Sequence, residues 1–323
     1  MWDPAPSREQ FRMWDLQLAA FGACGLLYWS GNRWRGGHWP HWGGLMDWSG
    51  HPEPDAEWAG ELGAFFERWG PTLLAHPVER SAGVLTDFDN RAALEVYPTI
   101  SGSRAVLPQT FAALHRLGIG TDTVSSAQSE RAEQLAQYHL VVVAAATCFD
   151  NPAAVEAMHQ YVLRGGTLIV TPFTAYMDRN GVFRGDGFAA NLAGLSGVVA
   201  RTVRWTGSPE KGNKPQLFAN WSGGGMSGRS PVGLDGYIEY LEITEHDTSA
   251  MAVFSSDQPI IEGKPAATLR KLGRGQVIKL GSGRPTTVFF HWFAVSAPRP
   301  AICSPIHCPM ASSQGRAPTA ACG

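Results

Sequence analysis

From about residue 80 onward, short apolar segments of strand length alternate with segments of helical periodicity, and this alternation constrains the fold most. The segments "AGVLTDFD", "QLAQYHLVVVAAAT" and "GTLIVTPF" each contain an apolar run that fits a buried strand. Helical patterns over 108–117 and 152–163 separate them. Strands that are joined by helices run parallel, with helices on both faces of the sheet. The sequence therefore predicts a parallel α/β unit over residues 79–200.

A different pattern follows, in which short strands alternate with turns. "GYIEYLEIT" and "AMAVFSS" are typical strands, and "KLGRGQV" is typical of a hairpin turn between two more. Residues 206–231 are rich in Gly, Ser and Asn and predict a mobile loop. We expect residues 201–290 to be a β-rich continuation of the α/β unit. Residues 291–323 have no periodicity and many Pro, Ser and Ala, which indicates a disordered or frameshifted tail.

The first 78 residues have a third pattern. Ser7 and Gln10 form a potential capping box at the start of a predicted helix over residues 7–22. A short apolar strand over 24–29, a loop rich in Gly, Trp and His, and a second helix over 53–69 follow. Helix, strand, loop and helix is the order found in a (β/α) barrel. One strand cannot close a barrel, so we expect the other strands to lie outside this chain.

Composition excludes several classes of protein. The formal net charge is −2 and no long basic block is present, so nothing indicates nucleic-acid binding. No apolar run reaches the roughly 18 residues that a membrane span needs. Residues 1–10 are polar and unlike a signal peptide, which favours a cytoplasmic location. The sequence contains neither GxGxxG nor GxxxxGK[ST] in the α/β unit, so we expect no nucleotide or other cofactor.

Cysteine usage argues against a disulfide framework or a structural zinc site, because the count of five is odd and no CxxC occurs. Cys24 and Cys148 lie in apolar sequence, and we expect both to be buried thiols.

Tryptophan is the unusual residue of this chain. Of the 12 tryptophans, eight lie in the first 58 residues. Clustered tryptophans in a loop offer flat apolar surfaces on which sugar rings stack, whereas in a core they form a packing cluster. Composition alone leaves both interpretations open.

The order of these parts resembles glycoside hydrolase family 42, whose β-galactosidases combine a TIM barrel, a flavodoxin-like trimerisation domain and a small β domain. "FRMWDLQLAAFGACGLLYWSGNRWRGGHWPHWGGLMDWSG" looks like the last barrel helix, the eighth strand and the loop after it. "SAGVLTDFDNRAALEV" and "LAQYHLVVVAAATCFDNPAAVEAMHQYVLRGGTLIVTPFTAYMDRNGVFRGDGF" resemble the trimerisation domain, and "GKPAATLRKLGRGQVIKLGS" matches the strand pair that closes it. The resemblance covers about residues 2–285 and implies that residues 1–78 are the end of a barrel domain.

The family uses two glutamates in a retaining mechanism, with carboxyl groups about 5–5.5 Å apart. The resemblance implies that both come from barrel strands before the eighth. Trp2 is the best match for a tryptophan that follows the nucleophile. We therefore expect the nucleophile and the acid/base upstream of Met1, and assign no catalytic residue to this chain.

The resemblance also implies a partial sugar-binding wall. Trp29 ends the predicted eighth strand, where the active sites of TIM barrels lie. The substrate-binding candidates are Trp2, Trp29, His38, Trp39 and His41. Family members often have Glu-x-x-His in this loop, and His38 replaces that glutamate. An imidazole cannot accept bonds from two hydroxyls as a carboxylate does, so the departure puts galactose specificity in doubt.

Other interpretations of these loop residues remain open. His38 and His41 could bind a metal or be merely exposed, although Pro40 lies between them and no third ligand is evident. Arg33 and Arg35 could contact sugar hydroxyls or form salt bridges with the neighbouring helices. On balance we expect no metal.

Two features of the α/β unit are candidate chemical sites. Asp87 and Asp89 follow the first strand and could hold Mg²⁺, although capping or solvation is the favoured interpretation. Cys148 could be a nucleophile of the kind found in class I glutamine amidotransferases, which this fold resembles. Its surroundings lack flanking glycines, and His159 has no obvious partner role, so we expect an unreactive thiol.

Two functional hypotheses follow. The first is part of a retaining β-galactosidase that hydrolyses terminal β-D-galactosides and, by resemblance, assembles as a homotrimer. The second is a non-catalytic assembly or carbohydrate-binding module, or a related glycosidase that acts on another sugar.

Overall fold

The protein is described by a computed structural model. It describes residues 6–37, 43–96, 106–178, 180–184, 190–205, 217–221, 232–233, 237–256 and 259–282. Within these residues no helix is both long and apolar enough to cross a membrane. The predicted tail, 291–323, lies outside them.

Two helices form most of the N-terminal part, as predicted. Helix α1 (Arg8–Ala20) begins with the complete capping box: the Ser7 side chain accepts from the Gln10 N–H, and the Gln10 side chain accepts from the Ser7 N–H. The chain leaves α1 through Gly22, whose φ of 93° favours glycine. Helix α2 (Pro54–Ala75) begins with a proline in its first turn and extends six residues past the predicted end.

The strand predicted over residues 24–29 does not form. These residues are irregular, and both Cys24 and Leu27 are exposed, so the prediction that the Cys24 thiol is buried is wrong. A strand exists only when a neighbouring strand takes up its N–H and C=O groups. No described strand lies beside this segment. Its apolar residues alone therefore do not make it a strand.

The α/β unit has the predicted parallel strands. They are β1 (Ala82–Thr86), β2 (Thr121–Ser125), β3 (Leu140–Val143) and β4 (Thr167–Val170). The order is β2-β1-β3-β4, and Val84 of β1 lies opposite Thr123 of β2 and Val142 of β3. The side chains of the two central strands are almost wholly buried, as expected for a sheet covered on both faces.

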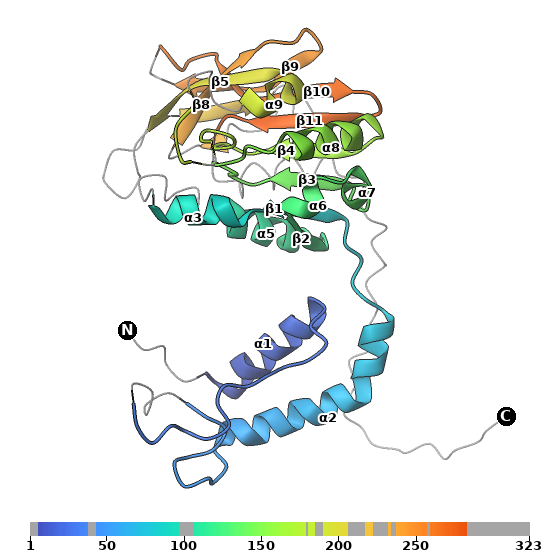
Figure 1. The fold of residues 1–323 in the computed structure, drawn as a ribbon, viewed down its shortest axis with the longest axis vertical. Helices are drawn as coiled ribbons and strands as arrows, with labels where there is room; N and C mark the ends of the chain where they lie inside the picture. The colour runs from blue at the N-terminus through green and yellow to red at the C-terminus, as the bar shows by residue number, and fades with distance from the viewer. Residues whose placement is uncertain are drawn as a thin grey trace, which may run out of the picture.

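Helices cover both faces of this sheet (Figure 1). They are α3 (Phe88–Val96), α5 (Val106–Arg116), α6 (Ser126–Ser129), α7 (Ala132–Leu135), α8 (Pro152–Leu163) and α9 (Ala190–Ser196). Leu114 of α5 packs in one apolar cluster with Val142, while Met158 of α8 packs in another with Val141 and Leu168. Adjacent residues of β3 thus belong to opposite cores, because side chains alternate across a strand.

The β-rich segment extends the same sheet. Strands β9 (Thr248–Ser256), β10 (Pro265–Leu272) and β11 (Gly275–Leu280) are antiparallel neighbours. Strand β11 also pairs in parallel with β4, so that Ile278 lies opposite Ile169. Within the described residues, nine strands form one mixed sheet in the order β2-β1-β3-β4-β11-β10-β9-β6-β7. A mixed α/β fold is confirmed, while the boundaries of the domains stay predictions.

Three further elements complete the β-rich region. Strands β6 (Leu217–Trp221) and β7 (Val232–Gly233) lie at the far edge of the sheet, and β6 falls inside the segment that was predicted to be one loop. Strands β5 (Val198–Trp205) and β8 (Tyr237–Ile243) pair in a separate antiparallel sheet.

A buried charged network links the second sheet to the first. Glu239 of β8 and Lys279 of β11 are both fully buried and form an ion pair. The Glu239 carboxylate also accepts from the Tyr176 hydroxyl and from the Phe173 N–H (2.7 Å), and Lys279 Nζ donates to the Thr171 carbonyl oxygen (3.2 Å). The loop after β4 is thereby tied to both sheets.

The two helices of the N-terminal part lie to one side of the α/β unit (Figure 1). Arg80, just before β1, joins the two parts: its guanidinium donates to the Phe21 carbonyl oxygen (2.8 Å) and to Asp122 Oδ1 of β2 (3.2 Å). The Phe21 ring also contacts the rings of Phe111 and His115 on α5.

Candidate carbohydrate-contacting loop

The loop that follows residue 28 holds its own backbone together. Met46 N–H donates to the Gly31 carbonyl oxygen (2.8 Å), and Arg33 N–H donates to the Met46 carbonyl oxygen (3.0 Å). Glu53 N–H, at the start of α2, donates to the Leu45 carbonyl oxygen (2.9 Å). The peptide bond between Trp29 and Ser30 is cis. The three hydrogen bonds fix the two sides of the loop against each other and against the beginning of α2.

In the described part of this loop, three tryptophan side chains are exposed. The relative exposures of Trp29, Trp34 and Trp48 are 73%, 46% and 49%. The rings of Trp29 and Trp34 lie 6.1 Å apart with 32° between their planes, and Trp48 Nε1 donates to the Trp34 carbonyl oxygen (3.0 Å). Exposed rings held on a bonded backbone are suited to stacking against the apolar face of a sugar.

The two arginines of the loop form contacts within it. Arg33 Nη2 lies 2.6 Å from Glu53 Oε2, and its guanidinium lies over the Trp48 ring, 5.3 Å from the centroid. Arg35 Nε donates to the Trp48 carbonyl oxygen (2.8 Å). For Arg33 the salt-bridge alternative is therefore the one observed, since Glu53 borders α2.

Of the predicted sugar-contacting residues, only Trp29 lies within the described residues. Trp2, His38, Trp39 and His41 lie outside them, so their positions relative to Trp29 stay predictions. Among the described residues no group of three His, Cys, Asp or Glu side chains could hold a metal ion.

Sequence reasoning missed a partly buried pair, Asp15 and Tyr28, at the start of the loop. Tyr28 Oη donates to Asp15 Oδ2 (2.5 Å), and the Tyr28 ring stacks on Phe11 with centroids 5.4 Å apart. Burial, together with the neighbouring Asp15 carboxylate, holds the pKa of Tyr28 well above its usual value. Asp15 is 8% exposed. In the sequence it lies between two apolar residues of α1, and this position is the signal that could have predicted its burial.

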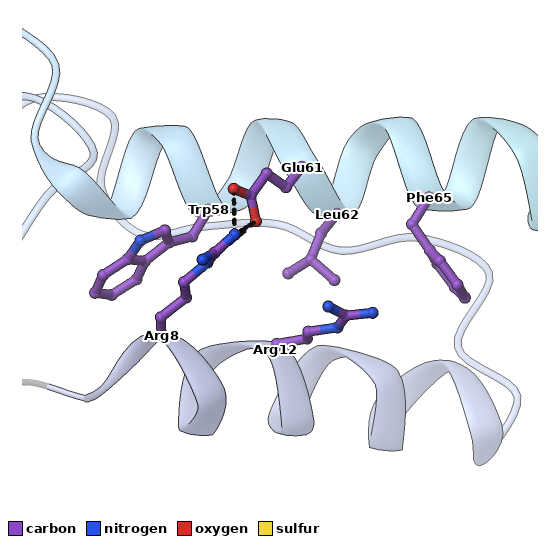
Figure 2. Close-up of a pocket in the computed structure, with 6 residues that line it drawn as sticks. All are labelled: Arg8, Arg12, Trp58, Glu61, Leu62 and Phe65. Atoms are coloured by element: carbon purple, nitrogen blue, oxygen red, sulfur yellow. Dashed lines mark hydrogen bonds and ion pairs between the residues drawn. The ribbon is translucent and has the colours of Figure 1, made fainter. Parts of the chain in front are cut away.

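A small cavity lies where the first half of α1 packs against α2 (Figure 2). Arg8 on α1 forms a two-oxygen ion pair with Glu61 on α2, at 2.6 and 2.7 Å from Nη2. Leu62 and Phe65 line the same space, whose volume is about 70 Å³. Binding pockets for small molecules measure roughly 300–1,000 Å³, so this cavity is too small to hold a sugar ring.

A second, much larger apolar groove lies beside the irregular segment 22–28. It has a volume of about 800 Å³ and is lined by the end of α1, this segment and one side of α2, including Leu26, Phe66 and Leu74. Leu74 is 64% exposed and Leu27, in the same segment, is 95% exposed. Apolar surface of this extent on a folded protein marks a place where another structure packs.

The two acids after β1 lie at the start of α3. Asp87 Oδ1 accepts from the Asn90 N–H (2.7 Å) and Oδ2 accepts from the Ser126 hydroxyl, so Asp87 caps α3. Asp89 is part of α3 itself. The capping interpretation is therefore the one observed for Asp87.

Cys148 lies in the same region and its side chain is buried. It is 8% exposed, and Sγ lies 3.8 Å from the Met177 sulfur. Burial, with smaller contributions from nearby carboxylates that include Asp178, raises the pKa of the Cys148 thiol to about 11. The prediction that the Cys148 thiol is buried is confirmed, while its lack of reactivity stays a prediction.

Comparison with known proteins identifies relatives that match most of this chain. Residues 80–297 match the model of the β-galactosidase trimerisation domain. A β-galactosidase of Alicyclobacillus acidocaldarius (BglY) is 29% identical over 278 residues, which cover 81% of this chain and 37% of the relative. A β-galactosidase of Planococcus sp. (BgaP) is 25% identical over 282 residues, covering 85% of this chain and 40% of the relative.

Solved structures show the same fold. The crystal structure of a β-galactosidase from Bacillus circulans sp. alkalophilus matches with a TM-score of 0.76 and 23% identity, over 91% of this chain and 42% of that chain. A β-galactosidase of Halorubrum lacusprofundi matches with a TM-score of 0.73 and 20% identity, over 91% and 42%. The chain thus spans about two fifths of the length of these proteins.

Proposed function

Because this chain belongs to the family of the β-galactosidase trimerisation domain, we propose that it is the assembly part of a family 42 β-galactosidase and also supplies one wall of its sugar site. The observation that carries the proposal is the nine-stranded sheet, which joins the parallel and β-rich segments within the matched residues 80–297. The reaction that we propose is hydrolysis of terminal β-D-galactosides with retention of configuration.

Under this proposal the nucleophile and the acid/base are not among the residues of this chain. The two carboxylates of the loop over residues 29–53 form hydrogen bonds and an ion pair within that loop. Glu53 pairs with Arg33, and Asp47 Oδ1 accepts from the backbone N–H groups of Ser49 and His51. A retaining glycosidase needs two carboxyl groups that face the scissile bond. Carboxylates committed to loop structure are poor candidates for either role.

We propose that residues 1–78 form the end of a barrel domain. The large apolar groove supports this proposal, because neighbouring barrel elements would cover it. Trp29 would then stack on the sugar at the edge of the pocket, and His38, Trp39, His41 and Trp2 are proposed to complete the contact. A barrel would also give the segment 24–29 the strand neighbours that it lacks here.

The proposed assembly is a homotrimer. Its support is the match of residues 80–297 to the β-galactosidase trimerisation domain. Light scattering coupled to size-exclusion chromatography should give three times the 34.9 kDa mass of the chain. A monomeric mass that persists at high protein concentration would contradict the proposal.

Hydrolysis is tested with nitrophenyl β-galactoside. The chain alone should release no nitrophenol, whereas a fusion that joins it to the unmatched part of the Alicyclobacillus relative should be active. Replacement of the relative's own matched region by this chain is thus the test of function. Turnover by the chain alone would show that an acid within residues 1–323 carries the chemistry.

A non-catalytic carbohydrate-binding module is the second candidate, and the exposed pair Trp29 and Trp34 favours it. A fusion that assembles and binds galactosides but does not turn them over, while the intact relative does, would support this alternative.

A further inference from the structure

Tyr28 immediately precedes the exposed ring of Trp29, and its own side chain packs inward. Its neighbours Leu27 and Trp29 are 95% and 73% exposed, whereas Tyr28 is partly buried. The Tyr28 hydroxyl donates to Asp15 Oδ2 (2.5 Å), and its ring stacks on Phe11 with 17° between the two planes. Both contacts lead to α1, so Tyr28 fastens the chain to this helix one residue before Trp29.

The helical side of this anchor is itself held in place. Asp15 is 8% exposed, and carboxylates are rarely buried to this extent without a partner. The Tyr28 hydroxyl supplies a partner, and hydrogen bonds to ionised groups are stronger than those between neutral groups. The Phe11 ring also meets the Trp58 ring of α2 edge-on, with centroids 5.9 Å apart. Tyr28 is therefore tied through α1 to α2 as well.

On the other side of Trp29 the chain is fixed at Ser30. The Ser30 carbonyl oxygen accepts from the Leu45 N–H (3.1 Å), and Ser30 Oγ donates to the Asn32 carbonyl oxygen (2.7 Å). Because the backbone is held on both sides of Trp29, the direction of its Cα–Cβ bond is set. The Trp34 ring, 6.1 Å away, restricts the remaining side-chain rotation.

A restrained exposed ring is a better binding platform than a free one. A side chain that becomes immobile only when its ligand binds weakens that binding by about two- to tenfold. Tryptophan has only two side-chain torsions, so fixing its backbone removes much of this cost before the ligand arrives. The contacts on either side of Trp29 act in this way on a ring that is 73% exposed.

We propose that Tyr28 and Asp15 are positioning residues of the sugar site, which hold the Trp29 ring in the orientation that stacks on the substrate. The inference rests on the proposed function, because it takes Trp29 to be the sugar platform. It deepens that function by giving a role to two residues that act through Trp29 and not on the sugar itself.

The first test follows the Trp29 ring in the whole chain, labelled with 5-fluorotryptophan. Its fluorine NMR signal is the one that Trp29→Phe removes. Tyr28→Phe keeps the stacked ring and loses only the hydroxyl, and Asp15→Ala removes the acceptor. We expect both variants to shift or broaden the Trp29 signal. Asp15→Asn should restore it towards that of the unaltered chain, because an amide oxygen still accepts from the Tyr28 hydroxyl.

A second tyrosine–aspartate pair provides the matched control. Tyr138 Oη donates to Asp122 Oδ2 (3.4 Å) within the α/β unit, so Tyr138→Phe removes the same group elsewhere. It should leave the Trp29 signal unchanged, while urea unfolding measures the loss of stability in each variant. An equal effect of Tyr28→Phe and Tyr138→Phe on the signal would reduce Tyr28 to a general structural role. A signal that neither Tyr28→Phe nor Asp15→Ala alters would overturn the anchoring.

The second test measures the consequence for the sugar, in the fusion to the unmatched part of the Alicyclobacillus relative. Stacking acts on the bound substrate and on the transition state alike. Tyr28→Phe should therefore raise KM for nitrophenyl β-galactoside about two- to tenfold and leave kcat nearly unchanged. Tyr138→Phe should change neither parameter. An active fusion whose KM is indifferent to Tyr28→Phe would overturn the positioning role.

Failure of the proposed function gives a different result. A fusion that is inactive already with the unaltered chain would refute the proposed function, and the positioning role in the sugar site with it, whatever the fluorine signal shows. A shifted Trp29 signal together with a raised KM supports both proposals.

Discussion

At the scale of single residues, the buried ion pair of Glu239 and Lys279 is the most consequential feature of the core. Both side chains are fully buried, and burial lowers the pKa of the Lys279 ammonium, against the opposing effect of Glu239. Tyr176, which donates to the same carboxylate, has its pKa raised well above the usual value by burial and by Glu239. The network is satisfied only while all of its members are present.

Lys279→Met should destabilise the protein by about 3–5 kcal/mol, because it leaves the Glu239 carboxylate buried without its counter-ion. Urea unfolding followed by circular dichroism measures this loss. Lys271→Met on the exposed face of β10 is the matched control, with an expected change within about 0.5 kcal/mol. A loss for Lys279→Met no larger than that of the control would show that the pair contributes nothing.

Cys148 allows a test that depends on pH. A thiol with a pKa of about 11 is almost wholly protonated at pH 8, and only the thiolate reacts. Iodoacetamide should therefore label the exposed Cys24 of the native protein well before Cys148. Labelling of Cys148 should rise about tenfold per pH unit while the pH stays below this pKa and the protein stays folded. Mass spectrometry of the two peptides gives both rates, and equal labelling at pH 8 would contradict the burial of Cys148.

At the scale of elements, a glycine is required where the backbone of another segment lies too close to leave room for a Cβ. Gly275 begins β11, and a Cβ there would lie 2.2 Å from the Val162 carbonyl oxygen of α8 and 2.3 Å from that of Gly166. Backbone atoms cannot move aside as a flexible side chain can. In contrast, Gly60 in the interior of α2 has no atom within 4 Å of an added Cβ.

Gly275→Ala should therefore lower the free energy of unfolding by about 1–3 kcal/mol, the usual cost of forcing atoms into a packed region. Gly60→Ala should instead raise it by about 0.5–1 kcal/mol, since alanine favours a helix interior. Thermal or urea unfolding of the pair tests both signs. If the two variants shift stability in the same direction, the close contact of β11 with α8 is not as described.

At the scale of the whole molecule, the four parallel strands β1 to β4 depend for their packing on β11, which lies near the end of the described chain. Strand β4 pairs with β3 on one side and with β11 on the other, although β4 and β11 are more than 100 residues apart. The sheet therefore spans both segments, and its centre is completed only when the last hairpin is in place.

A chain that ends before Pro265 should lose cooperative unfolding, because β4 would be left with an unpaired edge and both apolar cores would lose the residues of β10 and β11. A chain that ends at residue 290 lacks only the segment predicted to be disordered and should unfold like the whole chain. Urea titration followed by fluorescence compares the two. Cooperative unfolding of the shorter chain would show that the parallel half folds independently.

The sequence by itself determined the local elements of this protein and the order of its parts. Period and capping residues are local signals, which explains why α1, α8 and the hairpin of β10 and β11 lie where they were predicted. The resemblance to family 42 likewise rested on the order of local segments.

Only the tertiary structure decided the relations between distant segments. It placed β11 beside β4, buried Glu239 and Lys279 against each other, brought Asp15 to Tyr28, and left residues 24–29 without a ladder. The physical reason is the same in each case. A strand needs a neighbour and a buried charge needs a partner, and the identity of either is set by long-range packing that a local pattern does not encode.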